Sequence, residues 1–327
     1  MSFFAVLFAL ILEQARPLPR DNVVHESMVA WSRFAGRNFD AGQQRHAWLV
    51  WLVTVAVPAL AAWLAYALFA SLNVLAALAW NVAILYVTLG FRQFSYQFTD
   101  IREALDRGDE EGARQRLAQW RHLDASELPR SELLRHVIEH SLLAAHRHVF
   151  GVFFWFIALS AVGLGPAGAV FYRMAEFARR YWTYKVRTSD VATHERVMRL
   201  AQDLFALIDH VPARLTAFGF AVVGNFEEAV AGWRRDAGLW RHANEGIVLA
   251  AAAGALGVQL GGGVAPGISP ERVRPENDAL ESTEAAGSTP GMPPCSAHLD
   301  RVVGLVWRSV VLWMLLVALL TLARLLG

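Results

Sequence analysis

A run of 45 consecutive residues without Asp, Glu, Lys, Arg or His, from Ala47 to Phe91, most constrains what this chain can fold into. About 20 residues of helix cross a hydrocarbon core of about 30 Å. The run therefore predicts two membrane crossings joined by a tight turn, which we place at Ser71-Leu72-Asn73. Pro58 lies within the first crossing, where a bilayer environment tolerates a kinked helix. The lipid bilayer is thus the first predicted partner.

The composition agrees with a membrane protein and excludes several other classes. Of the 327 residues, 55% are hydrophobic and 18% are charged, against roughly 25% charged in an average soluble domain. The formal net charge of +1 argues against nucleic acid as a partner, because a nucleic-acid binder needs a basic face that displaces counterions. The single cysteine, Cys295, allows neither an internal disulfide nor a thiolate metal cluster.

Two further apolar segments lie near the ends of the chain. Phe3 to Leu12 is too short to span a bilayer and has no basic stretch before it, so we expect a packing or insertion helix there. Val302 to Leu326 is interrupted only by Arg308 and Arg324, which lie near its ends and can extend to the membrane surface. We therefore predict a C-terminal transmembrane helix over 299–327.

The distribution of arginine predicts the topology. Residues 15–46 carry five arginines and residues 92–147 carry nine, and both segments flank the apolar hairpin. The positive-inside rule places both in the cytoplasm. The basic segment 173–213 would then face outward if the uncharged stretch 149–172 crossed once. A glycine–proline break at 163–168 offers a return path, so we expect a re-entrant or broken helix pair.

These observations together predict an all-α, polytopic integral membrane protein. The predicted membrane domain covers 1–262 and includes cytoplasmic helices at 92–147 and 173–213. Six of the twelve prolines fall between Gly261 and Ser296, which predicts a flexible loop over 263–298 before the last span.

The residue spacing by itself gives two candidates for chemistry, a histidine pair and a glycine-rich segment. His136 and His140 lie one helical turn apart, as a metal pair requires, but the sequence offers no third ligand and the pair also fits a polar stripe on a helix. We therefore predict no metal site from spacing. The glycines between Gly254 and Gly263 are typical either of a phosphate-binding loop or of close helix packing in a membrane.

Several segments, in order, resemble the CobD/CbiB family, which contains the membrane-bound adenosylcobinamide-phosphate synthases of cobalamin biosynthesis. The similarity covers roughly residues 90–262. The matching segments are Ala104-Leu105 with Gly108-Asp109 and Ala113-Arg114, Glu139 with Trp155, Pro166-Ala167-Gly168-Ala169 with Tyr172-Arg173, Val211-Pro212-Ala213-Arg214-Leu215-Thr216, and Asn244-Glu245-Gly246 with the stretch Ala253 to Gly262.

The chain also departs from the synthase pattern that this resemblance implies. Positions where the pattern has acidic or amide side chains hold other residues here, and the His-Pro pair of the pattern is missing around His25. The departing positions are Leu143, Ala144, Glu176, Arg179, Phe205, Ala206 and Leu249. The loss of acidic oxygen ligands is similar to AmpE, a branch of the family associated with regulation of inducible β-lactamase. The resemblance therefore favours an AmpE-like regulatory protein of the bacterial inner membrane with a degraded synthase site.

The alternative is a working synthase, which would attach aminopropanol phosphate to adenosylcobyric acid. An ATP-dependent amide-forming ligase of this type implies ATP and Mg²⁺. The third hypothesis is a small-molecule transporter, although the predicted spans contain few charged residues that could line a transport pathway. The implied ligand is an anionic small molecule, either a corrinoid or a cell-wall fragment.

The resemblance implies one pocket at the cytoplasmic membrane face, built from the retained positions of separate motifs. Arg214 follows Pro212 and suits a helix start, where the helix dipole and the guanidinium would both favour an anion. Its alternative role is to pair with Asp209 or Glu139 and to fix helix packing. Glu139 is the candidate catalytic residue, and the candidate ligand-binding residues are Tyr172, Arg173, Arg214, Asn244 and Gly246.

Overall fold

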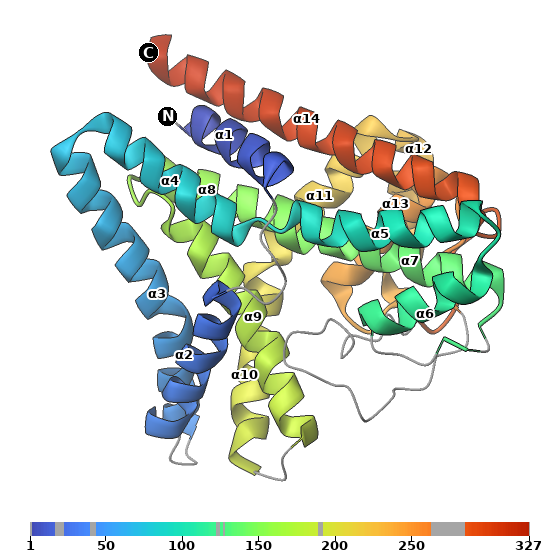
Figure 1. Cartoon of the computed structure of the whole chain (residues 1–327), viewed down its shortest axis with the longest axis horizontal. Helices are drawn as coiled ribbons and strands as arrows, with labels where there is room; N and C mark the ends of the chain where they lie inside the picture. Colours follow the sequence, from blue (N-terminus) through green and yellow to red (C-terminus); the bar gives the residue numbers. More distant parts are fainter. Residues whose placement is uncertain are drawn as a thin grey trace.

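The computed structural model describes residues 2–16, 23–39, 44–121, 125–126, 128–188, 192–262 and 285–326. Within this part of the chain the regular elements are all helices, accompanied by isolated β-bridges (Figure 1). The predicted all-α class is therefore confirmed. The helices are α1 Ser2–Ala15, α2 Val23–Phe39, α3 Gln44–Leu72, α4 Val74–Thr88, α5 Phe91–Asp106, α6 Glu110–Arg121, α7 Arg130–Ala145, the π-helix η1 His146–Phe150, α8 Gly151–Ala161, α9 Ala167–Thr188, α10 Ala192–Ile208, α11 His210–Val223, α12 Phe226–Asp236, the 3₁₀-helix η2 Ala237–Leu239, α13 Ala243–Leu256 and α14 Ser296–Leu326.

The long apolar run folds into the predicted helical hairpin. α3 ends at Leu72, and the Asn73 side chain caps α4 by accepting a hydrogen bond from the Ala76 N–H at 2.7 Å. The turn is therefore where the sequence predicts it. The prediction of a second crossing is wrong in length, because the 15 residues of α4 cover only about 22 Å of helix and the hydrocarbon core is about 30 Å thick. The chain bends at Leu89 and Gly90 and continues into α5 (Figure 1).

A long interior helix runs without a break from Arg130 to Ala161 and combines α7, η1 and α8. The sequence predicts cytoplasmic helices within 92–147 and a separate helix pair over 149–172, but not one continuous helix across this boundary. The two parts join through a π-turn, in which the Gly151 N–H donates to the carbonyl of His146. About 72% of the most apolar part of this helix is buried inside the protein.

The segment 149–172 is a broken helix pair, as predicted. α8 ends at Ala161, and the chain reverses through Gly163 and Gly165, whose φ values of 84° and 57° fall in the region that favours glycine. α9 then runs back along α8 (Figure 1). The two helices pack closely because Gly168 lies directly against the backbone carbonyl of Trp155.

Among the described residues, three helices are long and apolar enough to cross a membrane, and a fourth span arises if the bent pair α10–α11 counts as one. The three are His46–Leu72, Arg130–Ala161 and Ser296–Ala323. Large apolar side chains are exposed along α1, α3, α11 and α14, including Leu60, Phe218 and Leu315. Such exposure is typical of a surface that faces lipid rather than water. The short α1 packs against α4 and α14 (Figure 1).

The predicted loop over 263–298 is described only in its second part, since residues 263–284 lie outside the described residues. Residues 285–292 pair with segments on both sides of α13 in the chain, because Ala285 bridges to Trp240 before the helix and Ser288 to Gly261 after it. The Thr289 hydroxyl accepts a hydrogen bond from the Leu260 N–H at 2.9 Å. This part of the loop therefore packs against the interior helices.

The topology prediction can be tested at Arg107 and Arg187, which are both exposed and lie on different basic segments. In a Cys295→Ser background, cysteines introduced at these two positions should resist an impermeant maleimide in intact cells and react after permeabilisation, because the positive-inside rule places both segments in the cytoplasm. Labelling of position 187 but not 107 from outside would show that the 149–172 segment crosses the membrane once.

Candidate functional site

Four of the buried carboxylates lie close to the candidate positions, one each on α7, α9 and α13 and one at the α10–α11 break. They are Glu139, Glu176, Glu245 and Asp209. Burying a charged side chain is costly unless it is paired and hydrogen-bonded. Each of the four has at least one such partner, and together with these partners they are called the buried network below.

Glu139, the candidate catalytic residue, connects α7 with the segment that follows α13. Both of its carboxylate oxygens accept from Arg135 Nη1, at 3.1 and 3.2 Å. One of them also accepts from the Gly261 N–H at 2.7 Å. Gly261 has a φ of 75°, so the glycine-rich segment turns back toward α7 in a conformation that other residues rarely adopt.

Two arginines share the Glu245 carboxylate. Arg147, from the π-turn, donates to Oε1 at 2.8 Å, and Arg179, from α9, donates to the same oxygen at 3.3 Å. The Arg179 guanidinium also lies 4.8 Å above the ring centre of Phe205, in a cation–π contact.

A second arginine pair surrounds Glu176 on α9. Arg173 donates to Oε2 at 2.9 Å and Arg180 to the same oxygen at 3.0 Å. Arg173 is a predicted ligand-binding residue, and its ion-pair partner Glu176 lies one helical turn further along α9. Guanidinium groups held in this way suit phosphate or carboxylate ligands, which they bind through paired N–H donors.

Asp209 lies at the bend between α10 and α11. Its Oδ1 accepts from the hydroxyl of Tyr172, another predicted ligand-binding residue, at 2.8 Å. The same oxygen lies 3.0 Å from His146 Nε2, and His146 Nδ1 lies 2.9 Å from the Thr216 hydroxyl. His146 and His148 are both buried, because the π-turn continues α7 into the interior.

The remaining predicted ligand-binding residues lie at the start of α11 and α13. Arg214 is partly buried and donates to the His210 carbonyl at 2.8 Å, with Asn244 Oδ1 at 3.5 Å. Asn244 donates to the Ala206 carbonyl at 2.8 Å. Gly246 lies directly against the backbone carbonyl of Ala237, so any larger residue would push α13 away from η2. The structure brings Arg214 and Asn244 together and places Gly246 in a tight helix contact.

Several positions that depart from the synthase pattern take part in this network. Glu176 pairs with arginines, Arg179 pairs with Glu245, and Phe205 carries the Arg179 guanidinium. Two of these substitutions, Glu176 and Arg179, therefore place paired charges among the buried residues. Sequence reasoning also missed Arg135 and Arg147, although charged residues within an apolar helix are a recognised signal of function.

Mg²⁺, which the synthase reading implies, usually binds proteins through one or two carboxylates together with the phosphates of the substrate. No group of three or more His, Cys, Asp and Glu side chains that could hold a metal ion occurs in the described ranges. The buried carboxylates instead contact arginine, as Glu139 and Glu176 do. His140, one of the spaced pair, packs its ring edge-on to Trp120 at 4.4 Å.

The small residues around Gly254 serve helix packing. Gly254 lies against the backbone carbonyl of Glu228 on α12, and Gly232 lies against the carbonyl of Ala250 on α13. The two helices therefore approach until their backbones touch, which is the membrane-packing role of glycine. Gly257 ends α13 in the left-handed conformation, with a φ of 68°.

Comparison with known proteins agrees with the resemblance in the motifs. Residues 2–280 match the family described as CobD/Cbib protein. The chain is 32% identical over 322 residues to the "Cobalamin biosynthesis protein CobD" of Stutzerimonas stutzeri, covering 96% of both chains. It is 36% identical over 185 residues to the protein of the same name from Chromobacterium violaceum, covering 56% of this chain and 55% of that one. No solved structure matches. The chain therefore belongs to the CobD/CbiB family.

Proposed function

We propose that the protein acts in cobalamin biosynthesis as an adenosylcobinamide-phosphate synthase, which attaches aminopropanol phosphate to adenosylcobyric acid. The observation that carries this proposal is the similarity along 96% of both chains to a protein named for cobalamin biosynthesis. The names of the relatives favour this alternative over the AmpE-like regulator. The buried arginines and carboxylates support the same choice, because charged residues inside a membrane protein are usually functional.

The chemistry of the network suits substrates that carry phosphate. ATP would supply the phosphoryl group that activates the carboxyl of the acceptor, and the phosphates of ATP and of aminopropanol phosphate need cationic partners. Arg147 and Arg179, oriented by Glu245, and Arg173 and Arg180, oriented by Glu176, offer such partners. Guanidinium groups whose direction is fixed by a carboxylate bind phosphate with little further loss of conformational freedom.

The interior position of these residues supports a ligase in a second way. An activated carboxyl reacts with water unless water is excluded, and a buried polar site favours attack by the amine instead. Glu139 would fix the segment after α13 against α7 through its bond to the Gly261 N–H.

Complementation tests this proposal. The wild-type gene should restore growth to a bacterial strain that lacks the synthase on medium with adenosylcobyric acid as the only corrinoid. Glu139→Gln and Arg179→Met should each reduce cobalamin formation at least about tenfold, which corresponds to about 1.4 kcal/mol of lost transition-state stabilisation. Cobalamin is measured by mass spectrometry, together with the amount of protein in the membrane fraction.

Glu195→Gln is the matched control, because Glu195 is an exposed acid that pairs with Arg199 one turn along α10. It should complement fully. If the wild-type protein reaches the membrane in normal amount and does not complement, the synthase proposal is wrong.

A further inference from the structure

An apolar groove with a volume of about 450 Å³ lies between α3 and the hairpin that α8 and α9 form. Its wall on α3 consists of side chains spaced three or four residues apart, which places them on one face of the helix. They include Leu52, Ala56, Leu60 and Trp63. The opposite wall comes from the end of α8, the turn after it and the start of α9, where Phe171 contributes its ring. The side chains of the described residues that line the groove carry no charge and no hydroxyl, amide or carboxyl group, so none of them would orient a polar ligand.

The groove opens on a surface that faces lipid. Leu52 and Leu60 line it and are nevertheless 44% and 51% exposed, and both belong to the helix over 46–72, which is apolar enough to cross a membrane. The hydrocarbon core supplies no water to such a place, and lining atoms without neighbours would lose their dispersion contacts. Hydrocarbon from the surrounding bilayer therefore fills the groove.

The length of the groove matches that of one lipid chain. From Leu52 to Trp63 its wall on α3 covers about 16 Å of helix. This is close to half the thickness of a hydrocarbon core of about 30 Å, which is the depth that a chain from one leaflet reaches. A chain in the groove would contact α3 on one side and Leu164 and Phe171 on the other.

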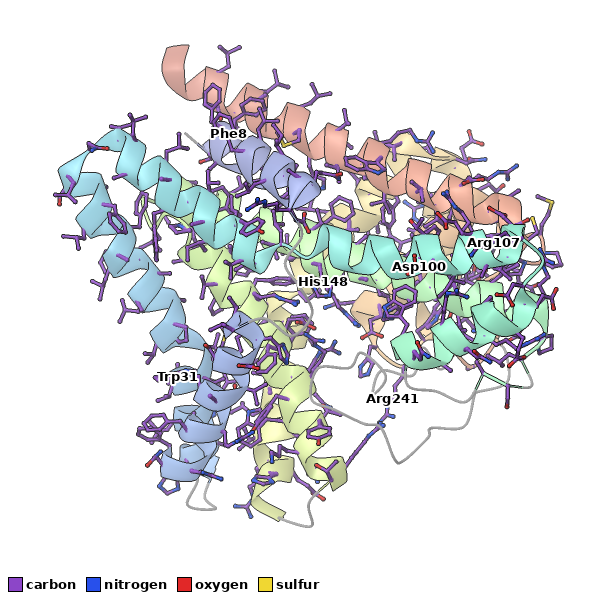
Figure 2. All side chains as sticks on the ribbon, in the orientation of Figure 1. Phe8, Trp31, Asp100, Arg107, His148 and Arg241 are labelled. Atoms are coloured by element: carbon purple, nitrogen blue, oxygen red, sulfur yellow. The ribbon has the colours of Figure 1, made fainter. Side chains whose placement is uncertain are left out.

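The end of the groove at Leu52 lies on the side of basic residues of α2. The carbonyl of Val53, which also lines the groove, accepts a hydrogen bond from Trp31 Nε1 on α2 at 3.1 Å. Figure 2 labels Trp31 where α2 lies beside α3, and from there α2 continues toward the start of α3 (Figure 1). Arg33 and Arg37 follow on α2 and are exposed. Their guanidinium groups suit the phosphate of a lipid headgroup.

We propose that this groove binds one acyl chain of a membrane phospholipid, whose phosphate lies toward Arg33 and Arg37. Helices in a bilayer gain stability from close packing, because lipid is as apolar as their own side chains. A chain in the groove packs against protein on two sides, whereas a chain at a convex surface packs on one, and this difference favours the groove. The site requires the membrane setting of the protein and is independent of the proposed synthase activity.

The test uses the full chain in phosphatidylcholine vesicles that contain a small fraction of phosphatidylcholine with a photoreactive diazirine in one acyl chain. After irradiation, mass spectrometry of proteolytic fragments locates the labelled residues. Labelling of Leu52 and Leu60 should exceed that of Leu68 and Leu315 at least about threefold, which corresponds to about 0.7 kcal/mol of preference for the groove. The two reference leucines lie outside the groove and are 61% and 58% exposed, so labelling that followed exposure alone would give a ratio below one.

Ala56→Phe should bring this labelling ratio down to one or less, because the added ring occupies the space of the chain. Ala61→Phe is the matched control, since Ala61 is exposed on the same helix and does not line the groove, and it should keep the wild-type ratio. Size-exclusion chromatography confirms that each variant is folded. If Ala56→Phe does not fold, Val57→Phe takes its place, because Val57 also lines the groove and is 42% exposed.

The proposal is overturned if the wild-type ratio is one or less, or if the first of these two groove variants that folds keeps the wild-type ratio. A low ratio together with a dimeric mass by light scattering would assign the groove to a second copy of the chain instead. None of these results depends on complementation. A protein that fails to complement but shows the preferred labelling would retain the lipid site and lose only the proposed function.

Discussion

Glu245→Gln should lower the free energy of unfolding by about 3 kcal/mol, because it takes away a buried carboxylate that two arginines contact. Arg147 and Arg179 both donate to Glu245 Oε1, and all three side chains are largely buried. A neutral amide keeps the shape but not the charge, so two guanidinium groups would repel each other across it. Thermal unfolding of the purified protein in detergent measures the effect.

The exposed acid Glu195 again offers the matched control, since it pairs with a single arginine at the surface of α10. Exposed ion pairs contribute little to stability, and Glu195→Gln should unfold at nearly the wild-type temperature. Equal melting temperatures for the wild type and Glu245→Gln would mean that the two arginines do not depend on this carboxylate, which would contradict the description of the network.

Gly168→Leu should prevent the α8–α9 hairpin from closing and abolish stable accumulation in the membrane. A Cβ at position 168 would overlap the backbone carbonyl of Trp155, and a backbone atom cannot move aside as a flexible side chain does. Overpacking a tight core costs about 1–3 kcal/mol where side chains can adjust, and more where they cannot. The measurement is the amount of folded protein by fluorescence-detected size-exclusion chromatography.

Gly219→Ala provides the comparison within another interior helix. Gly219 lies on α11, and a Cβ there would meet no atom within 4 Å. Alanine favours a helix over glycine by roughly 0.5–1 kcal/mol, so this variant should accumulate at least as well as the wild type. If Gly168→Leu also accumulated normally, the close contact of α8 with α9 would not be required for folding.

The membrane character of this protein and the position of its first hairpin follow from local sequence. A long uncharged run leaves no alternative to apolar helices, and the Asn73 cap ends one helix and begins the next. The broken helix pair at 149–172 was also predictable, because glycine readily adopts positive φ values. Gly163 and Gly165 adopt such values where the chain reverses. These features depend on residues that are neighbours in the chain.

The continuity of the helix over 130–161 was not predictable in the same way. Charged residues within it, such as Arg135, Glu139 and Arg147, are typical of a solvated helix when the sequence is considered alone. In the structure they are buried and paired. A pattern of residue types does not reveal whether a partner from another helix is available to neutralise a buried charge.

The composition of the candidate site likewise depends on which helices pack together in the folded protein. The sequence, through its resemblance to a known family, indicated Glu139, Tyr172, Arg173, Arg214, Asn244 and Gly246 as positions of interest, and it determined the helical class and the membrane setting. Only the tertiary structure decided which charges meet. Arg147 and Glu245 are 98 residues apart in the chain, and His146 and Asp209 are 63 apart. Electrostatic pairing depends on distance in space, which the packing of whole helices sets and no local pattern encodes.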